Sequence, residues 1–226
     1  MSFANRLQGV FFNPQPTFKA LSEKPVWIDA LIIILIFAAV LSSIAGYYGF
    51  QDRLKDMENN PKYADRMEAM KKVPAAVLML FSGLSGLIAF GLGFLIAALV
   101  LLVMGRLFTT EGSFLAVFSA LLHANFIDKI LGSSVRVILI LVRKSATQAT
   151  TSLAILAPHA APTSNAFVIL SQFDFFQLWM FWVLGYGLSA VFKIPMKKSL
   201  AMSYGFWLLK SLVLVAISLL SRSIMS

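Results

Sequence analysis

Four ionisable residues lie inside stretches that are otherwise apolar, and they are the residues of this chain best suited to chemistry. Asp128, Lys129 and Arg136 share one apolar stretch, and Lys210 lies at the middle of another. A charge at the centre of a bilayer costs at least about 2.5 kcal/mol, so such a group normally faces a partner, water or the interior of a bundle. The spacing predicts an ion pair between Asp128 and Lys210, with Arg136 as a second partner on the same face.

Two kinds of role fit this candidate polar cluster. As a polar site or an ion path, it would make the protein a small-solute or ion transporter or channel. As a structural clamp, it would hold two helices in register. The first two apolar stretches offer little that would continue a polar path, so the sequence favours the clamp.

No other residues form the pattern of a catalytic or metal site. His123 has no histidine, cysteine or acid at a metal-ligand spacing, and His159 lies in a Pro-rich stretch. The sequence lacks a nucleophile elbow, a glycine-rich phosphate loop and a zinc-binding His-Glu pair. The chain has no cysteine, which excludes disulfides and thiolate ligands. We therefore expect no catalytic residue, no cofactor and no metal, and a protein that is not an enzyme.

The composition shows which solvent surrounds the elements that position these residues. Hydrophobic residues make up 59% of the 226 residues and charged residues 13%, against roughly 45–50% and 25% in soluble domains. A soluble fold of this size could not cover so much apolar surface, so the helices must face a bilayer. The net charge of +9 is distributed beside the apolar stretches. This placement favours anionic lipid headgroups as partners and argues against nucleic acid.

Five apolar stretches are long enough to cross a bilayer as helices, at about 1.5 Å per residue and with a core of roughly 30 Å. We expect an all-α, polytopic bundle with spans at about 27–50, 74–104, 114–142, 174–192 and 200–220. A charged extramembrane loop or helix at 51–73 and a Ser/Thr/Ala/Pro-rich loop at 145–165 connect them. A secretory signal competes for the first stretch, since Ser43-Ile44-Ala45 resembles a cleavage site. The apolar core of a signal is typically only about 7–15 residues, which disfavours that interpretation.

The first 26 residues (1–26) form a separate amphipathic segment. Its apolar residues recur at helical spacing, and its polar residues are expected opposite them: Phe3, Leu7, Val10 and Phe11 on one face, and Asn5, Arg6 and Gln8 on the other. Asn13-Pro14 ends this helix, because proline lacks the amide donor. We expect the helix to lie in the headgroup plane as an interfacial element.

Two further helix starts are visible in the sequence. Asn60 followed by Pro61 places a capping residue before a proline in the first turn. Asp174 with Gln177 three residues later has the form of a capping box. The Asp174 carboxylate is therefore expected to satisfy a helix start at the membrane interface.

The second span carries a packing signal. Small residues recur every fourth position along it: Ser85, Ala89, Gly93 and Ala97. Such a seam lets the backbone of another helix approach closely. We expect it to pack a neighbouring helix or a second copy of the chain.

Two stretches resemble one family. The first contains Arg6-Leu7, Phe11-Phe12-Asn13-Pro14, Pro16-Thr17-Phe18, Leu21, Pro25 and Trp27. The second contains the runs Phe173 to Trp179, Gly187 to Phe192 and Lys197 to Ala201, together with Gly185. Both patterns resemble the bacterial members of the Yip family of integral membrane proteins.

The resemblance implies a five-helix bundle in the bacterial inner membrane with a cytoplasmic amino terminus. The cations divide almost evenly between the two faces and do not decide this orientation. The resemblance also implies a non-enzymatic protein that organises the membrane or protein partners, as a homo-oligomer or with another membrane protein. Eukaryotic relatives bind Rab-type GTPases, but their Asp-Leu-Tyr-Gly-Pro type motif is missing here. A transporter or channel built on the polar cluster is the alternative.

Overall fold

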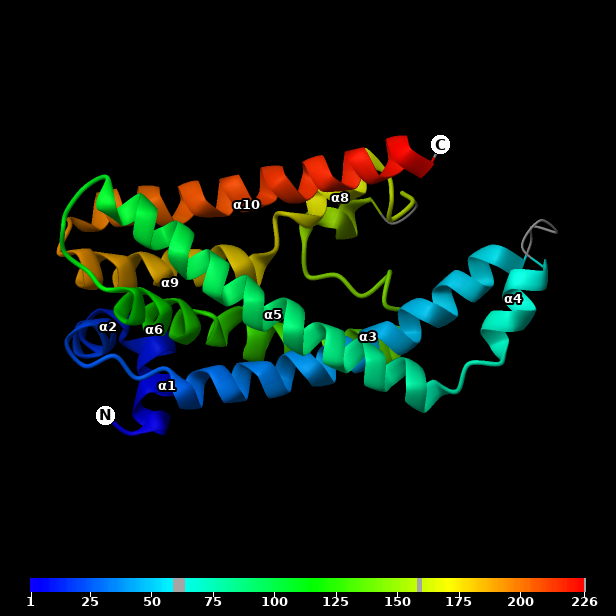
Figure 1. Ribbon diagram of the computed structural model, residues 1–226, viewed down its shortest axis with the longest axis horizontal. Coiled ribbons are helices and arrows are strands. Elements are labelled where there is room, and N and C mark those ends of the chain that lie inside the picture. The colour runs from blue at the N-terminus through cyan, green and yellow to red at the C-terminus, as the bar shows by residue number, and fades with distance from the viewer. Residues whose placement is uncertain (59–63, 158–159, 226) are drawn as a thin grey trace.

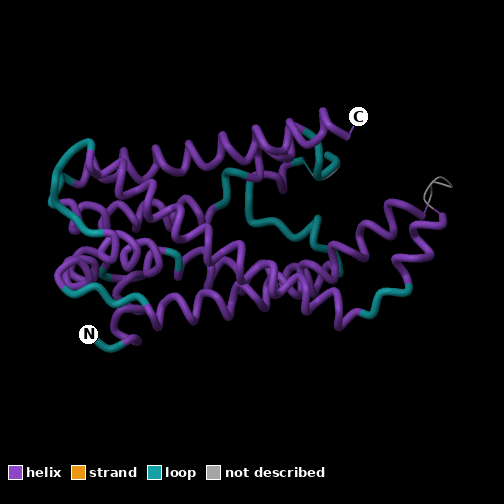
Figure 2. Tube along the Cα trace, in the orientation of Figure 1, coloured by secondary structure: helices purple, strands orange, loops and turns teal. Residues whose placement is uncertain are grey.

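Helices that run along one common direction build most of this molecule. The computed structural model describes residues 1–58, 64–157 and 160–225. Figure 1 shows an elongated bundle in which the amino terminus lies near one end and the carboxy terminus lies toward the other. In Figure 2 most loops lie at the ends of the bundle, and one long run between α7 and α9 lies beside the helices.

Four helices of the described residues are long and apolar enough to cross a membrane. They are α3 (Ile28–Glu58), α5 (Ala75–Arg106), α9 (Phe175–Phe192) and α10 (Met196–Met225). Many of their large apolar side chains face outward, for example Phe81, Ile88 and Val103, each more than 60% exposed. Such surfaces are stable only in an apolar solvent, so the protein is a multi-pass membrane protein.

The predicted third span is helical but interrupted. It consists of α6 (Phe114–Ala124), a π-helix η2 (Phe126–Gly132) and α7 (Ser133–Arg143). None of the three pieces reaches the length of a span by itself, so the structure supplies four candidate spans and the fifth stays a prediction. Helix α6 is buried on all sides over most of its length, since every residue from Ala116 to Ala124 is buried.

The amino-terminal segment packs against the bundle. Helices α1 (Phe3–Phe12) and α2 (Pro14–Glu23) bury Val10, Phe18 and Leu21, and Phe11 contacts the ring of Trp179 at 5.9 Å between centroids. The predicted position of Arg6 on the polar face is wrong, because its side chain is only 5% exposed. At about 100° per residue Arg6 lies beside Val10, so the helical period itself turns it inward.

Helices α3 and α5 pack through small residues, but not through the predicted seam. A Cβ added at Gly83 or Gly86 would overlap the hydroxyl of Ser43 or Ser42 on α3, so these glycines permit the close approach. The predicted seam lies on another face: Ser85, Ala89 and Gly93 are exposed and Ala97 is partly so. A Cβ at Gly93 would meet nothing within 4 Å. The expectation that this seam packs a neighbouring helix of the chain is therefore wrong.

The charged segment after the first span continues as helix. α3 extends to Glu58 and α4 (Ala64–Lys71) follows, so the ionic residues here are largely on helices. Pro74 occupies the N-cap position of α5 without a side-chain capping hydrogen bond. The predicted helix start at Asn60 and Pro61 lies outside the described residues, as does His159.

The long connection between α7 and α9 is fixed at both ends. At its start, the carboxylate of Asp52 on α3 accepts hydrogen bonds from the hydroxyl of Ser145 and the amides of Ala146 and Thr147, at 2.9–3.1 Å. At its end, Ser152 forms an isolated β-bridge with Asp174. The short helices η3 (Leu153–Leu156) and α8 (Asn165–Ser171) lie within this connection.

Candidate functional site

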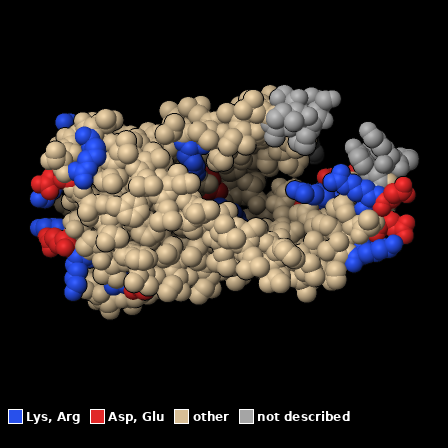
Figure 3. All heavy atoms as spheres, in the orientation of Figure 1, with Lys and Arg blue, Asp and Glu red and all other residues tan. Residues whose placement is uncertain are grey.

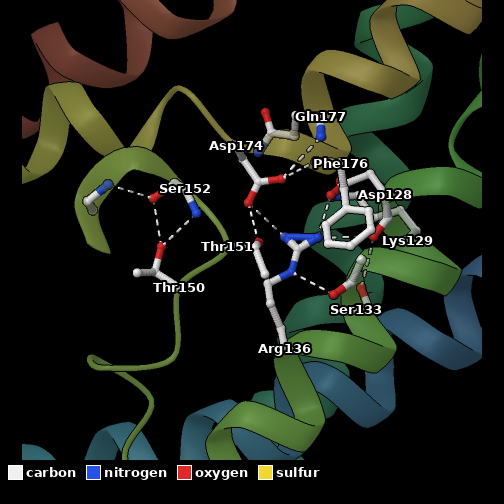
Figure 4. Close-up of polar contacts among 12 residues, drawn as sticks. Asp128, Lys129, Ser133, Arg136, Thr150, Thr151, Ser152, Asp174, Phe176 and Gln177 are labelled. Atoms are coloured by element: carbon white, nitrogen blue, oxygen red, sulfur yellow. Dashed lines mark hydrogen bonds and ion pairs between the residues drawn. The ribbon is translucent and has the colours of Figure 1, made fainter. Parts of the chain in front are cut away.

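The π-helix carries the charged centre of the bundle at Asp128. The side chain of Asp128 is 2% exposed, and its carboxylate pairs with Lys129 at 2.6 Å and with the guanidinium of Arg136. Figure 4 shows these side chains converging beside the start of α9. Two cations on its own helical run therefore neutralise this buried carboxylate, and the predicted contact between Asp128 and Arg136 is present.

Arg136 links the π-helix to its surroundings. Its Nη2 also donates to the main-chain carbonyl of Asp128 at 3.0 Å, and its Nε donates to the carbonyl of Gly132 at 3.2 Å. Its Nη1 lies 3.9 Å from the carboxylate of Asp174. A π-helix contains wider turns that leave main-chain carbonyls available to side chains, and a guanidinium has enough donors to satisfy several of them.

Asp174 connects this centre to α9 and to the long connection. It is the N-cap of α9, and its Oδ1 accepts from the amides of Phe176 and Gln177 at 2.9 and 3.1 Å. Its other oxygen accepts from the hydroxyl of Thr151. The capping role predicted for Asp174 is present, whereas the side chain of Gln177 accepts from Lys210. We call Asp128, Lys129, Arg136 and Asp174 the Asp128 cluster.

The predicted ion pair between Asp128 and Lys210 is wrong as a direct contact. Among the described residues, Lys210 donates to the neutral side-chain oxygen of Gln177 and lies 5.5 Å from the ring centroid of Phe181. Lys129, the sequence neighbour of Asp128, and Arg136 occupy both carboxylate oxygens. Lys210 therefore lies beside the Asp128 cluster but is not one of the ion-pair partners of Asp128 in the described structure.

Gly132 allows α9 to approach the end of the π-helix. A Cβ at this position would lie 2.7 Å from Arg136 Nη2 and 2.9 Å from the side chain of Phe176. Both contacts are too close for an unshifted side chain. Arg136 and Phe176 therefore leave no room for a larger side chain at Gly132.

The comparisons with known proteins give one result. The family model of the Yip1 domain matches residues 9–218. The chain belongs to the Yip1 family. No curated protein and no solved structure matches it.

This Yip1-family protein has a second charged junction, which lies near its amino terminus. The guanidinium of Arg6 on α1 pairs with Asp29 at the start of α3, and its Nε donates to Nε2 of His123 at 3.1 Å. Nδ1 of His123 donates to the carbonyl of Ser119 at 2.8 Å. His123 is thus a fully buried histidine with a partner on each ring nitrogen, as a neutral imidazole requires. We call Arg6, Asp29 and His123 the amino-terminal junction.

The two junctions of the Yip1-family chain join helices through ion pairs and hydrogen bonds. Within the ranges that the structure describes, no group of three His, Asp or Glu residues could hold a metal ion. The cluster residues are ion-paired or hydrogen-bonded to one another, and hydroxyls nearby such as that of Thr151 donate to a carboxylate. Such a network stabilises one packing of the helices.

Sequence reasoning missed the roles of four residues in this Yip1-family chain: Thr151, Asp52, Arg6 and Asp29. Thr151 and Asp52 carry no signal of their own in a polar segment. Arg6 could have been found, because its helical spacing from Val10 places it on the buried face. A buried arginine requires acceptors, and Asp29 is an acid close to it in sequence.

Proposed function

We propose that this protein is a non-enzymatic organiser of the membrane. In this role a five-span bundle holds lipids and neighbouring membrane proteins, or further copies of itself, against its outer surface. The observation that carries this proposal is that the buried Asp128 has its ion-pair partners on its own helical run, at 2.6 Å in the case of Lys129. Such a carboxylate is not free to exchange a substrate or an ion. Arg136, which binds it, also lies 3.9 Å from Asp174 at the start of α9, so the cluster joins the helical run to α9.

The contacts of Asp52 support the topology of five spans. Because Asp52 at the end of α3 binds Ser145 and Thr147, both segments lie at the same face of the membrane. The chain between them must then cross an even number of times. α5 supplies one crossing, and the helical run Phe114–Arg143 supplies the other. With α3, α9 and α10 this makes five.

The topology can be tested cleanly because the chain has no cysteine. Single cysteines at the exposed positions Lys19, Arg53 and Lys144 would be labelled with a membrane-impermeant maleimide in intact inner-membrane vesicles of known orientation. We expect Arg53 and Lys144 to react together on one face and Lys19 to react on the other, cytoplasmic, face. Labelling of Lys19 and Lys144 from the same side would contradict the five-span topology.

The organising function predicts reproducible neighbours. A photoreactive amino acid at Ile88, which is 64% exposed on α5, should crosslink to the same membrane protein or to a second copy in independent preparations. The matched control is Leu101 on the same helix, which is fully buried and should crosslink only within the chain. Identification of the crosslinked product by mass spectrometry is the readout.

A transporter or channel would be recognised by solute flux and not by reproducible neighbours. Purified protein in proteoliposomes would then release ions or small solutes at a rate that falls in a Lys210→Met variant. We expect no flux above that of empty liposomes for either protein. A flux that depends on Lys210, without reproducible neighbours at Ile88, would overturn the proposed function.

A further inference from the structure

A groove opens beside Lys210 between the outer helices. It lies between α5 and α10, has a volume of about 400 Å³, and is closed from below by α9 and the π-helix. Figure 3 shows charged atoms inside a recess in the middle part of the molecule, where the surrounding surface is uncharged, whereas the other charged atoms in this view lie at the two ends. The groove therefore combines a hydrophobic opening with a polar floor.

The walls of the groove are hydrocarbon. Phe90, Ile96 and Val100 line it from α5, and Leu209 and Val213 line it from α10. Ile96 is 61% exposed and Val213 is 49% exposed, so these walls are accessible from the bilayer. No ionisable residue occurs on α5 before Arg106 at its end. Walls of this kind match acyl chains.

The floor of the groove is cationic. Asp128, Lys129, Gln177 and Lys210 line it. Together with Arg136 and Asp174, which bind Asp128 or lie beside it, the ionised groups are three cations and two acids. The excess is one positive charge, and Lys210 accounts for it, because its hydrogen-bond acceptor in the described structure is the neutral Gln177. A ligand with one negative charge would balance the floor.

The depth of the floor is compatible with a lipid headgroup. Lys210 follows Met196, the first residue of α10, by fourteen positions, which is about 21 Å of helix. Counted from Lys198, the last charged residue before the span, Lys210 is twelve positions or about 18 Å deep in a core of roughly 30 Å, which is near the middle and only slightly nearer to the face opposite Lys197 and Lys198. A lysine side chain can extend toward that face, and a headgroup can descend toward it.

The size of the groove matches a small ligand better than a whole helix. A helix is about 10 Å across with its side chains, so a segment as long as the α5 wall would need several times the volume available. A volume of about 400 Å³ falls in the range of roughly 300–1,000 Å³ that small ligands occupy. Small residues on α5, Ala89, Gly93 and Ala97, make the groove deep where a larger side chain would fill it.

We propose that the groove binds one anionic phospholipid, with an acyl chain between α5 and α10 and its phosphate at Lys210 and Lys129. This proposal rests on the proposed organising function and names one lipid class that the protein holds. The ammonium of Lys210 donates to the phosphate in addition to Gln177. The ammonium of Lys129, which lies 4.8 Å from the ring centroid of Phe90 at the groove wall, does so in addition to Asp128.

The test is lipid binding by the purified full-length protein. Delipidated protein in neutral detergent would be titrated with phosphatidylglycerol or phosphatidylcholine, and the bound lipid would be counted by native mass spectrometry. We expect one retained phosphatidylglycerol with a preference of about fivefold to tenfold over phosphatidylcholine, since a lysine contributes about 1 kcal/mol to an anionic lipid. Lys210→Met should abolish most of this preference, and Lys210→Arg should retain it. Lys198→Met, an exposed cation outside the groove, should leave it unchanged.

A second pair of variants tests the hydrophobic wall without touching a charge. Gly93→Phe fills the groove, and a Cβ at Gly93 meets nothing within 4 Å. The matched control Gly91→Phe lies on the same helix outside the groove lining and also meets nothing within 4 Å. Gly93→Phe should lose the retained lipid, and Gly91→Phe should keep it.

Each outcome bears on the proposal. Retention of phosphatidylglycerol by Gly93→Phe, or an unchanged preference in Lys210→Met, would overturn it, as would equal retention of both lipids by the unaltered protein. Circular dichroism of every variant identifies loss of fold, and a folded Gly93→Phe decides the question even if Lys210→Met is unfolded. If the lipid results fail while the Ile88 crosslinks persist, the groove assignment falls and the organising function stands.

Discussion

The two charged junctions of the bundle both include residues of the helical run Phe114–Arg143, yet they differ in how well their charges balance. The amino-terminal junction joins α1, α3 and α6 through one cation, one acid and a histidine. The Asp128 cluster has two cations and two acids, and Lys210 beside it adds a third cation that faces a groove. The charges of the amino-terminal junction balance, whereas the groups around Asp128 carry one excess positive charge, and the proposed lipid site rests on this difference.

The largest loss of stability is expected from a substitution in the Asp128 cluster. Asp128→Asn removes the buried carboxylate from between Lys129 and Arg136 and leaves two partly buried cations without an ionised partner at this position. Removing one partner of a buried ion pair typically costs about 3–5 kcal/mol. Denaturant unfolding in detergent should show a loss of this size, and the double variant Asp128→Asn with Arg136→Met should lose less than the sum of the two. Strictly additive losses would show that the cluster is not a clamp.

A smaller loss is expected when the amino-terminal junction is broken. Arg6→Met leaves Asp29 and His123 without their donor, and hydrogen bonds to charged groups contribute about 2 kcal/mol. The side chain of Asp29 is 40% exposed, so water can replace part of the contact. Arg6→Lys should be intermediate, because an ammonium keeps the charge but lacks the planar fork. A loss of stability in Arg6→Met larger than that in Asp128→Asn would show that the amino-terminal junction contributes more to stability than the Asp128 cluster.

Packing beneath the Asp128 cluster should matter less than its charge. Gly132→Ala introduces a Cβ within 2.9 Å of Phe176, and overpacking of this kind costs about 1–3 kcal/mol. The matched control is Gly93→Ala, where the added Cβ meets nothing. Thermal unfolding followed by circular dichroism distinguishes the two. Equal melting temperatures for both variants would show that Gly132 is not constrained by α9.

The smallest effect on stability is expected at Lys210. Lys210→Met loses a hydrogen bond between a charged ammonium and neutral Gln177, worth about 2 kcal/mol, but it also removes the cost of holding an ammonium inside the membrane, which offsets most of the loss. Because the two residues share no direct ion pair, Lys210→Met and Asp128→Asn should combine additively within about 0.5 kcal/mol. A coupling well above that value in the double-mutant cycle would restore the direct pair between Asp128 and Lys210.

The sequence predicted the membrane class and the residues that gather at the charged centre, because both depend on local composition. Asp128, Lys129 and Arg136 share one helical run, so the sequence places them near one another, although the contact of Arg136 with Asp128 also depends on the π-helix between them. The partner of Lys210 depends on how α9 and α10 are placed, which no local pattern encodes. The direct pair with Asp128 was wrong for this reason.

Packing faces were harder to predict than charges. α5 carries two sets of small residues, and the sequence alone does not show which set meets α3. Gly83 and Gly86 meet serines of α3, whereas Ala89 and Gly93 line the groove. Arg6 was misplaced because its charge outweighed its helical position. A periodicity argument that treats every residue alike would have placed it inside.

The π-helix changes the direction around the helix axis in which the later residues of the run point. In a regular α-helix, positions eight apart differ by about 80° around the axis, so Arg136 would point away from Asp128. The wider turns of Phe126–Gly132 take up part of this rotation and bring the two side chains to one azimuth. A regular α-helix with the same residues would keep every ionic group, yet it would place the guanidinium about 80° around the axis from the carboxylate.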